Sequence, residues 1–310
     1  MTTAHAPGKI ILIGEHAVVY GQPAIAVPVW EVVATATITN LLKDSGCTLL
    51  APDINLRLRL IDASDELPLA LVTRLALTHL GLPANPDWQI KVHSQIPMAG
   101  GLGSGAALSA ALVRAIGAHA GQPTPPALIS ELVFASERLY HGTPSGIDNA
   151  TIAYEMPIWF VKGQPPVPFT PHNPLTIAIA DSGIPAPTKA TVSEVRRHWQ
   201  ATPDRYARLF AAIGQIALAA RQAIEQGDVD ELGRLFNHNQ AHLAELGVSS
   251  GPFNTLIQVA KSAGALGAKL SGGGRGGNVI ALVQASHTAP VTQALLAAGA
   301  KRVIVTTVRR

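Results

Sequence analysis

The sequence contains a single cysteine, Cys47, and this scarcity excludes two kinds of structure. One thiol cannot form a disulfide within the chain, and it cannot build a metal site that needs several cysteine ligands. Only 14% of the residues are charged and 5% are aromatic, while 47% are hydrophobic. This composition is typical of a globular protein and unlike that of a disordered one. A chain without disulfides suits a reducing environment, so we expect a cytoplasmic protein.

Long hydrophobic runs and strong charge are also missing from the chain. No apolar run approaches the roughly 18 residues that a membrane span requires. Residues 1–10 lack the basic head and the cleavage site of a signal peptide. The formal net charge of +3 is small and is not gathered into runs. The sequence therefore favours neither a membrane nor a nucleic acid as a partner.

The pattern of apolar residues predicts a mixed α+β protein with two domains. Short buried or alternating segments indicate strands, and apolar residues at helical spacing indicate helices. The expected strands cover residues 10–13, 24–29, 31–40, 88–92, 175–180, 278–283 and 302–308. The expected helices cover residues 67–80, 105–120, 126–142, 204–226, 228–246, 252–263 and 289–298. Five prolines within residues 161–174 indicate a connecting segment. We therefore expect one domain over residues 1–165 and another over residues 175–310.

A glycine-rich loop precedes the helix expected at residues 105–120. Four of the six residues 100–105 are glycine, at a junction between a strand and a helix. Glycines let backbone amides approach a polyphosphate, and the helix N-terminus adds N–H groups without helical partners. The loop matches neither the Walker motif nor the dinucleotide motif. We expect a phosphate-binding loop of another type, in which Ser104 offers its hydroxyl to a phosphate or to magnesium.

A second glycine-rich loop runs from Lys269 to Asn278, between a helix and a strand. Five of the six residues 272–277 are glycine, where a structural turn needs only one or two. We expect the backbone of this loop to pack against a ligand or against the first glycine loop. Arg275, the exception among the six, either reaches a phosphate or points to solvent, and the sequence favours neither.

Charged residues near apolar segments form a third group. Lys9 enters a strand that we expect to be buried, and it needs a partner because an unpaired buried ammonium is costly. Asp148, in a turn rich in glycine and proline, is a candidate for that partner. Glu137 lies in the preceding helix, while Glu15 and His16 follow the first strand. Such residues are individually common as turn formers or solvated side chains, and only their combination indicates a site.

These motifs, in this order, resemble those of the GHMP kinases, the superfamily of galactokinase, homoserine kinase, mevalonate kinase and phosphomevalonate kinase. Residues 7–21 are of the mevalonate kinase type, and so are residues 141–149. Residues 237–240, followed by 246–249, also resemble that type. The resemblance covers essentially the whole chain. It implies the GHMP kinase fold, with an N-terminal domain like domain 2 of ribosomal protein S5 and a ferredoxin-like C-terminal domain.

The resemblance also implies an activity, the phosphorylation of the mevalonate hydroxyl by ATP and magnesium in isoprenoid precursor synthesis. By position, Asp148 matches the carboxylate that activates the acceptor hydroxyl, and Lys9 matches the lysine that pairs with it. Glu137 matches the magnesium ligand, with Ser104 as a second candidate. The implied ATP-binding residues are Ser94, Pro97, Ala99, Gly100, Gly101, Leu102, Gly103, Ser104 and Gly105, and the implied substrate-binding residues are Glu15, His16, Asp148 and Thr188. Residues 182–188 match a loop that can close over the substrate, and the resemblance favours a homodimer.

Two positions depart from the family pattern. Gly105 stands where the family usually has a second serine that helps to bind magnesium, so Ser104 or a water would take its place. Arg275 interrupts a run that is usually Gly-Ala-Gly-Gly-Gly-Gly, and it could add a charge near a phosphate. Two alternatives stay open: another kinase of the superfamily, acting on phosphomevalonate or a related acid, and a non-catalytic ligand-sensing member. The presence of Lys9, Glu137 and Asp148 argues against the non-catalytic alternative.

Overall fold

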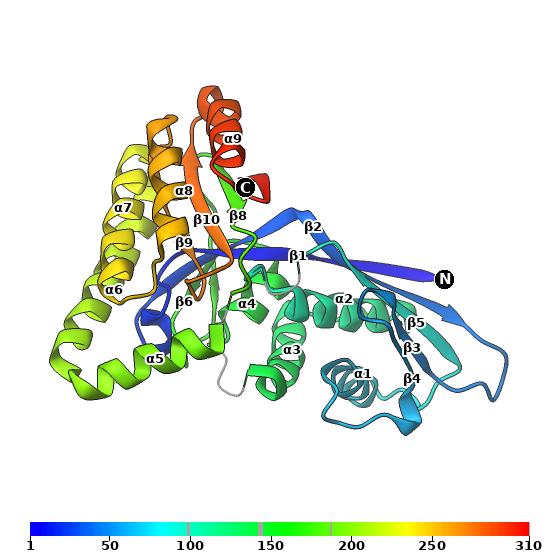
Figure 1. The fold of residues 1–310 in the computed structure, drawn as a ribbon. Helices are drawn as coiled ribbons and strands as arrows, with labels where there is room; N and C mark the ends of the chain where they lie inside the picture. Colours follow the sequence, from blue (N-terminus) through cyan, green and yellow to red (C-terminus); the bar gives the residue numbers. More distant parts are fainter. Residues whose placement is uncertain (98–99, 142–144, 187, 310) are drawn as a thin grey trace. The chain divides into compact units, whose positions relative to one another are not determined.

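The structure, a computed structural model, describes residues 1–97, 100–141, 145–186 and 188–309 (Figure 1). Packing divides the chain into two compact units. Unit 1 comprises Met1–Gly8, Val32–Pro97 and Gly103–Glu155, and unit 2 comprises Lys9–Glu31, Met98–Leu102 and Met156–Arg310. Strands β1 (Thr2–Ile13) and β2 (Ala24–Asn40) each run through both units. The domain boundary expected within residues 161–174 stays a prediction.

Strand β2 is continuous, which corrects the prediction of two separate strands. Trp30 and Glu31 are both exposed, and this pair interrupts the apolar pattern without bending the backbone out of the strand. From Val32 to Ile38 burial then alternates residue by residue, because successive side chains of a strand point to opposite faces of the sheet. The interruption marks a change in burial and not the end of the strand.

Unit 1 contains a sheet with helices packed on one another beside it. Its strands are β3 (Thr48–Ala51), β4 (Leu56–Arg59), β5 (Trp88–Ser94) and the second half of β2, in the order β4-β3-β5-β2, and β1 also pairs with β2. Strand β3 is parallel to β5, and the pairs of β3 with β4 and of β2 with β5 are antiparallel. The helices are α1 (Pro68–His79), α2 (Ser104–His119), α3 (Pro126–His141) and α4 (Ile147–Tyr154). Alanines of α2 such as Ala106, Ala107 and Ala110 are fully buried, and their small size lets α1, α3 and β5 approach it closely (Figure 1).

Unit 2 is built on a four-stranded antiparallel sheet. Its strands are β8 (Leu175–Asp181), β9 (Gly267–Ser271), β10 (Asn278–Val283) and β11 (Arg302–Val308), in the order β11-β8-β10-β9. Strands β9 and β10 form a hairpin, whereas helices connect β8 to β9 and β10 to β11. This connectivity is that of the ferredoxin-like fold, so the prediction for the second half of the chain is confirmed. Two short strands, β6 (Ile158–Phe160) and β7 (Val167–Pro168), pair with each other, and β6 also pairs with the start of β2.

The helices of unit 2 are those expected from the sequence, with one addition. They are α6 (Pro203–Gln226), α7 (Val229–Glu245), α8 (Gly251–Ser262) and α9 (Thr288–Ala297), and the addition is α5 (Thr188–Ala201). Helix α5 is highly polar, and only Thr191 and Val195 are buried in it. Its apolar stripe, which includes Val192, Val195 and Trp199, is narrow, and no helix was expected here from the sequence.

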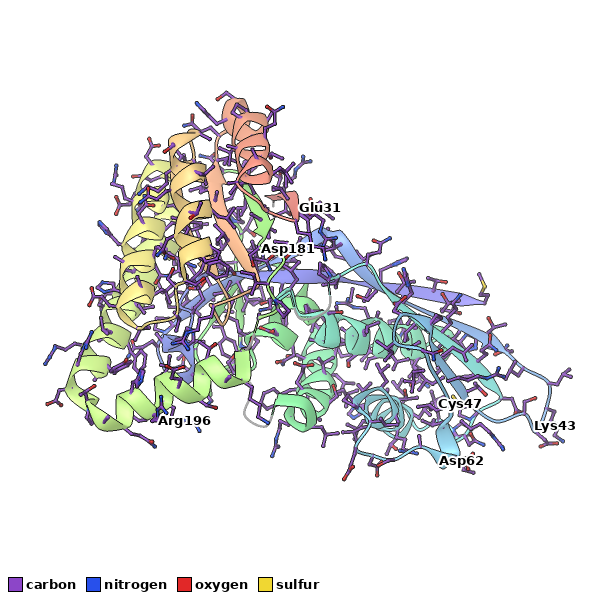
Figure 2. All side chains as sticks on the ribbon, in the orientation of Figure 1. Glu31, Lys43, Cys47, Asp62, Asp181 and Arg196 are labelled. Carbon is purple, nitrogen blue, oxygen red and sulfur yellow. The ribbon has the colours of Figure 1, made fainter. Side chains whose placement is uncertain are left out.

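Two expectations from composition can be compared with the structure. Cys47 is buried in unit 1 (Figure 2), and burial raises the pKa of its thiol to about 12, so this cysteine is not poised to react. Within the described residues, none of the helices has both the length and the apolar character needed to cross a membrane.

Candidate active site

The first glycine loop joins β5 to α2, as the sequence predicts, and Ser94 fixes one end of it. The Ser94 hydroxyl lies 3.1 Å from the Ser104 hydroxyl and accepts a hydrogen bond from the Ile96 N–H at 3.1 Å. The Ser94 N–H donates to the Asp53 carboxylate at 2.7 Å. Ser94 thus connects the end of β5 to the start of α2, and Pro97 follows it half-buried. Ala99, also expected at the phosphates, lies outside the described residues.

The N-terminus of α2 offers a binding site for an anion. Gly103 precedes the helix with a φ of 75°, a left-handed conformation that favours glycine, and as the N-cap residue it has no side chain to cap the first turn. The first N–H groups of this 16-residue helix therefore have no helical acceptor and no cap from the side chain of Gly103. These groups, together with the positive end of the helix dipole, attract a phosphate group.

Glu137, on α3, faces Gly105 at the start of α2. Glu137 is buried, and a Cβ on Gly105 would lie 3.2 Å from the Glu137 Oε1 atom. Magnesium prefers oxygen ligands, keeps several waters and binds through one or two carboxylates plus phosphates of the substrate. A buried carboxylate, the neighbouring Ser104 hydroxyl and the space left at Gly105 fit such an ion. The missing side chain at position 105 leaves room for a water beside the carboxylate.

Asp148 lies in the first turn of α4, which corrects the prediction that it lies in a turn after a helix. Gly146, with a φ of 95°, precedes α4 and ends the segment that was expected to be irregular. The buried Asn149 side chain donates to the backbone oxygen of Ser130 at 3.0 Å and to its hydroxyl at 2.8 Å. These bonds fix the start of α4 to α3, so the Asp148 carboxylate is held at a helix N-terminus, where an anion is favoured. Residues 142–144 of the same motif lie outside the described residues.

Lys9 is buried within β1 in unit 2, with 4% of its surface exposed. Its backbone N–H donates to the Leu102 oxygen at 3.0 Å, so β1 contacts the first glycine loop. The Asn278 side chain makes a second contact with that loop by donating to the Gly100 oxygen. The pairing of Lys9 with Asp148 stays a prediction.

The second glycine loop, residues 272–277, is packed against the protein's own backbone. A Cβ at most of its glycines would collide with a neighbour or press tightly on one. The contacts are Gly273 with Thr188, Gly274 with Val248, Gly276 with Pro185 and Gly277 with Gly100. The loop therefore packs against the first glycine loop, which was one of the two expected arrangements. It also packs against residues 185–188, which include the expected substrate-binding residue Thr188.

Arg275 forms an ion pair with Glu194 on α5. Neither of the two arrangements expected from the sequence, a phosphate contact or a side chain in solvent, included this partner. The charge that Arg275 adds to the glycine loop is therefore balanced within unit 2.

Glu15 is fully buried, and both of its carboxylate oxygens have partners in unit 2. Oε1 accepts from the ammonium of Lys269, and Oε2 accepts from the Asn239 side chain at 3.0 Å. Lys269 is itself completely buried in β9 and lies near the ring of Phe236. Burial lowers the pKa of Lys269, and the adjacent Glu15 carboxylate opposes that change. In this structure the Glu15 carboxylate binds Lys269 and Asn239. Its expected contact with a substrate stays a prediction.

Sequence reasoning missed Lys269, although a signal for it was present. Lys9 was singled out because it borders an apolar segment and would need a partner when buried. The same argument applies to Lys269. The partner could not be found in the same way, because Glu15 lies 254 positions away in the sequence.

The motif at residues 237–240 supports the edge of the sheet in unit 2. Strand β9 is an edge strand, so some of its N–H groups have no partner strand. The Asn237 side chain accepts from the Ala268 N–H at 3.3 Å, and the Gln240 side chain accepts from the Leu270 N–H at 3.0 Å. This segment thus fixes β9, and with it the start of the second glycine loop.

His16 occupies a rare backbone conformation. It has a φ of 60° and a ψ of −50°, and the Ala17 N–H donates to the Glu15 oxygen at 2.7 Å. These values describe a γ-turn with positive φ, which is uncommon and strained, and strain of this kind concentrates at functional sites. The buried imidazole Nε2 lies 3.0 Å from the Gly273 oxygen. Because a carbonyl only accepts, Nε2 carries the proton and connects this turn to the second glycine loop.

The buried His16 makes the stability of the protein depend on pH. Burial lowers its pKa from 6.5 to about 4. In the unfolded chain the imidazole binds a proton near pH 6.5, whereas the folded protein resists protonation, so stability decreases as the pH falls from 6.5 towards 4. The loss attributable to His16 is roughly 3 kcal/mol. We expect urea unfolding at a series of pH values to show this decrease in the wild type and a smaller one in His16→Asn, which tolerates positive φ. Parallel pH profiles for the two proteins would contradict it.

Comparison with known proteins matches both halves of the chain to one family. Residues 69–155 match the GHMP kinases N terminal domain, and residues 220–301 match the GHMP kinases C terminal model. The mevalonate kinase of Pyrococcus furiosus is 30% identical over 96% of this chain and 93% of its own. That of Aeropyrum pernix is 32% identical over 90% of this chain and 87% of its own.

Solved structures agree with these relatives. The crystal structure of L. major mevalonate kinase in complex with R-mevalonate has a TM-score of 0.83 and 27% identity, over 100% of this chain and 96% of that one. A phosphomevalonate kinase from Streptococcus pneumoniae has a TM-score of 0.85 at 16% identity, a likeness of fold alone. The protein is therefore a phosphotransferase that uses ATP, and the chain belongs to the GHMP kinase family, alongside relatives that are named mevalonate kinase.

Proposed function

We propose that the protein transfers the γ-phosphoryl group of ATP to the hydroxyl of mevalonate in a magnesium-dependent reaction that yields phosphomevalonate. The observation that carries this proposal is the near full-length similarity to mevalonate kinases at about 30% identity. The expectations of a homodimer and of a cytoplasmic location belong to the same proposal.

Phosphoryl transfer depends on in-line positioning and on neutralisation of charge on the transferring oxygens. The N–H groups at the start of α2 and the dipole of that helix would bind the phosphates, with Ser94 and Ser104 shaping the loop. Glu137 and Ser104 would hold magnesium, which neutralises phosphate charge when it is bound. These groups are preorganised because Glu137 and Gly105 already face each other.

The acceptor hydroxyl must lose its proton as it attacks. We assign Asp148 as the general base, since α4 holds its carboxylate in a fixed position. Lys9 would provide a positive charge that favours the ionised form of that carboxylate. His16 and Thr188, which both contact the second glycine loop, would contact the acceptor, and Glu15 would fix the turn that carries His16.

The role of Glu137 predicts a change in magnesium requirement. Glu137→Gln removes a charged oxygen ligand, so we expect the magnesium concentration for half-maximal rate to rise by about tenfold or more. A magnesium titration of the initial rate at saturating ATP measures this. Glu131→Gln, an exposed residue on the same helix, is the matched control and should change little. An unchanged titration for Glu137→Gln would show that the ligand is another residue.

The acceptor is tested by coupled ADP release with ATP and magnesium. Mevalonate, phosphomevalonate, homoserine and galactose are compared in parallel. Turnover with mevalonate alone supports the proposal. Turnover with phosphomevalonate instead would favour the related kinase, whose fold is equally similar. No turnover with any of the four would favour the non-catalytic alternative.

A further inference from the structure

Arg275 is the one residue other than glycine among residues 272–277 of the second glycine loop, and it has a φ of 59°. An L-residue at positive φ is disfavoured, and glycine would adopt this conformation without strain. The Arg275 side chain must therefore make contacts that offset the unfavourable backbone.

The guanidinium makes contacts in two directions within unit 2. It donates two hydrogen bonds to the Glu194 carboxylate, one from Nη1 to Oε2 and one from Nη2 to Oε1 at 3.1 Å. Its Nε and Nη2 atoms also donate to the Gly247 oxygen, at 3.1 Å and 2.9 Å. The Arg275 N–H donates to the Val248 oxygen at 3.0 Å. This fork geometry is specific to arginine and is stronger than a single charged hydrogen bond.

The pair is partly shielded from water. The Arg275 side chain is 36% exposed and the Glu194 side chain 29%. Arg196, on the same helix, is exposed (Figure 2). The guanidinium holds the pKa of Glu194 below its usual value, so the carboxylate is charged at neutral pH.

The same glycine loop also holds the segment that leads into α5. The Gly277 N–H donates to the Ile184 oxygen at 2.8 Å, and the Ser182 N–H donates to the Gly277 oxygen at 2.9 Å. Gly273 is in close contact with Thr188, the first residue of α5. The loop therefore contacts Ser182 and Ile184 through backbone hydrogen bonds and packs against Thr188, and Arg275 adds a contact two turns into the helix.

Buried residues also hold helix α5 in unit 2. Thr191 and Val195 are its buried residues, and Trp199, near its end, stacks edge-on against Tyr20 with ring centroids 5.0 Å apart. The apolar contacts of Val195 and Trp199 thus lie in the second half of α5, whereas Thr191 is buried in the first half, where the Arg275–Glu194 pair adds a charged contact.

We propose that Arg275 is a positioning residue that holds the first turns of α5, and therefore Thr188, against the second glycine loop, and that it thereby sets the affinity for the acceptor. The link to the acceptor rests on the proposed function of Thr188. The link between Arg275 and the order of α5 does not.

Three variants test separately whether Arg275 orders α5 and whether it sets the affinity for the acceptor. Arg275→Gly removes the pair without straining the backbone, Glu194→Gln removes the charge of its partner, and Arg275→Lys keeps the charge but loses the fork. Arg234→Gln, which breaks the exposed pair with Glu231 on α7, is the matched control. Amide hydrogen exchange of residues 188–195 is measured first, without ligands, followed by steady-state kinetics for mevalonate and for ATP.

In Arg275→Gly and Glu194→Gln we expect amide exchange in residues 188–195 at least fivefold faster than in the wild type, with α6 unchanged. The KM for mevalonate should rise about five- to twentyfold, while kcat and the KM for ATP change less than twofold. In Arg275→Lys the KM for mevalonate should rise less than in Arg275→Gly, because lysine keeps the charge. The double variant should be no worse than either single one, because both remove the same contact. Arg234→Gln should match the wild type in every readout.

Unchanged exchange in residues 188–195 would overturn the proposal. So would faster exchange with an unchanged acceptor KM. If the wild type does not phosphorylate mevalonate, the proposed function fails. The exchange comparison still decides whether Arg275 orders α5, and the kinetic comparison is made with the acceptor that the parallel assay identifies.

Discussion

Replacing Asp148 with asparagine is expected to lower kcat by about a hundredfold to ten-thousandfold, the range that a positioned general base contributes. Asparagine has nearly the same shape but cannot take the proton of the acceptor hydroxyl. Because Asn149 and the N–H groups of α4 stay in place, the helix and its contacts should persist. ATP binding, measured by calorimetry, should therefore remain near that of the wild type, and the loss should appear in kcat.

Asp204→Asn is the matched control for this substitution. Asp204 also lies in the first turn of a helix, α6, and is exposed. The control shows what an aspartate at a helix N-terminus contributes to stability alone, which is typically below about 1 kcal/mol. Near-normal turnover by Asp148→Asn would remove Asp148 from the mechanism. A parallel loss of ATP binding and folding stability would show a structural role instead.

Replacing Lys269 with methionine is expected to destabilise the protein by about 3–5 kcal/mol, because it leaves the Glu15 carboxylate charged and buried without its cation. Both side chains are completely buried, so water cannot take the place of the ammonium. Asn239 alone remains to bind the carboxylate. Urea unfolding at pH 7.5 measures the change, with activity recorded at a temperature where the variant is still folded.

Two comparisons separate the buried ion pair from a general effect of losing a charge. Arg234→Met breaks an exposed pair in the same unit and should cost less than about 1 kcal/mol. Combining Lys269→Met with Glu15→Gln removes both charges and should restore much of the stability. If Lys269→Met unfolds within about 1 kcal/mol of the wild type, the buried pair does not hold β9 to the turn at Glu15.

Much of the local structure and part of the site could be predicted from the sequence. The helices α1, α2, α3, α6, α7, α8 and α9 follow from apolar residues repeating along one face, a pattern set by neighbours three and four positions apart. The two glycine loops were found for the same reason, since their conformation depends on adjacent glycines. The burial of Lys9 followed from the apolar residues next to it.

Where the local pattern was weak or misleading, the prediction failed. Helix α5 is mostly polar, with only a narrow apolar stripe, and it is held by contacts with the rest of unit 2. In β2, Trp30 and Glu31 interrupt the apolar pattern and suggested a break, but the strand is continuous from Ala24 to Asn40. In both cases the tertiary environment outweighed the local preference.

The amino-acid sequence by itself determined the kinase family, the glycine loops and most of the helices, because each of these is encoded by residues close together in the chain. Only the tertiary structure decided which charges meet. Glu15 pairs with Lys269 across 254 positions and Arg275 with Glu194 across 81, and the uncharged Asn278 side chain likewise donates to the Gly100 oxygen across 178. A charged residue within an apolar segment is expected to be buried, and a buried charge needs a partner; both inferences use only neighbouring residues. The identity of the partner depends on how distant segments pack, and no local pattern carries that information.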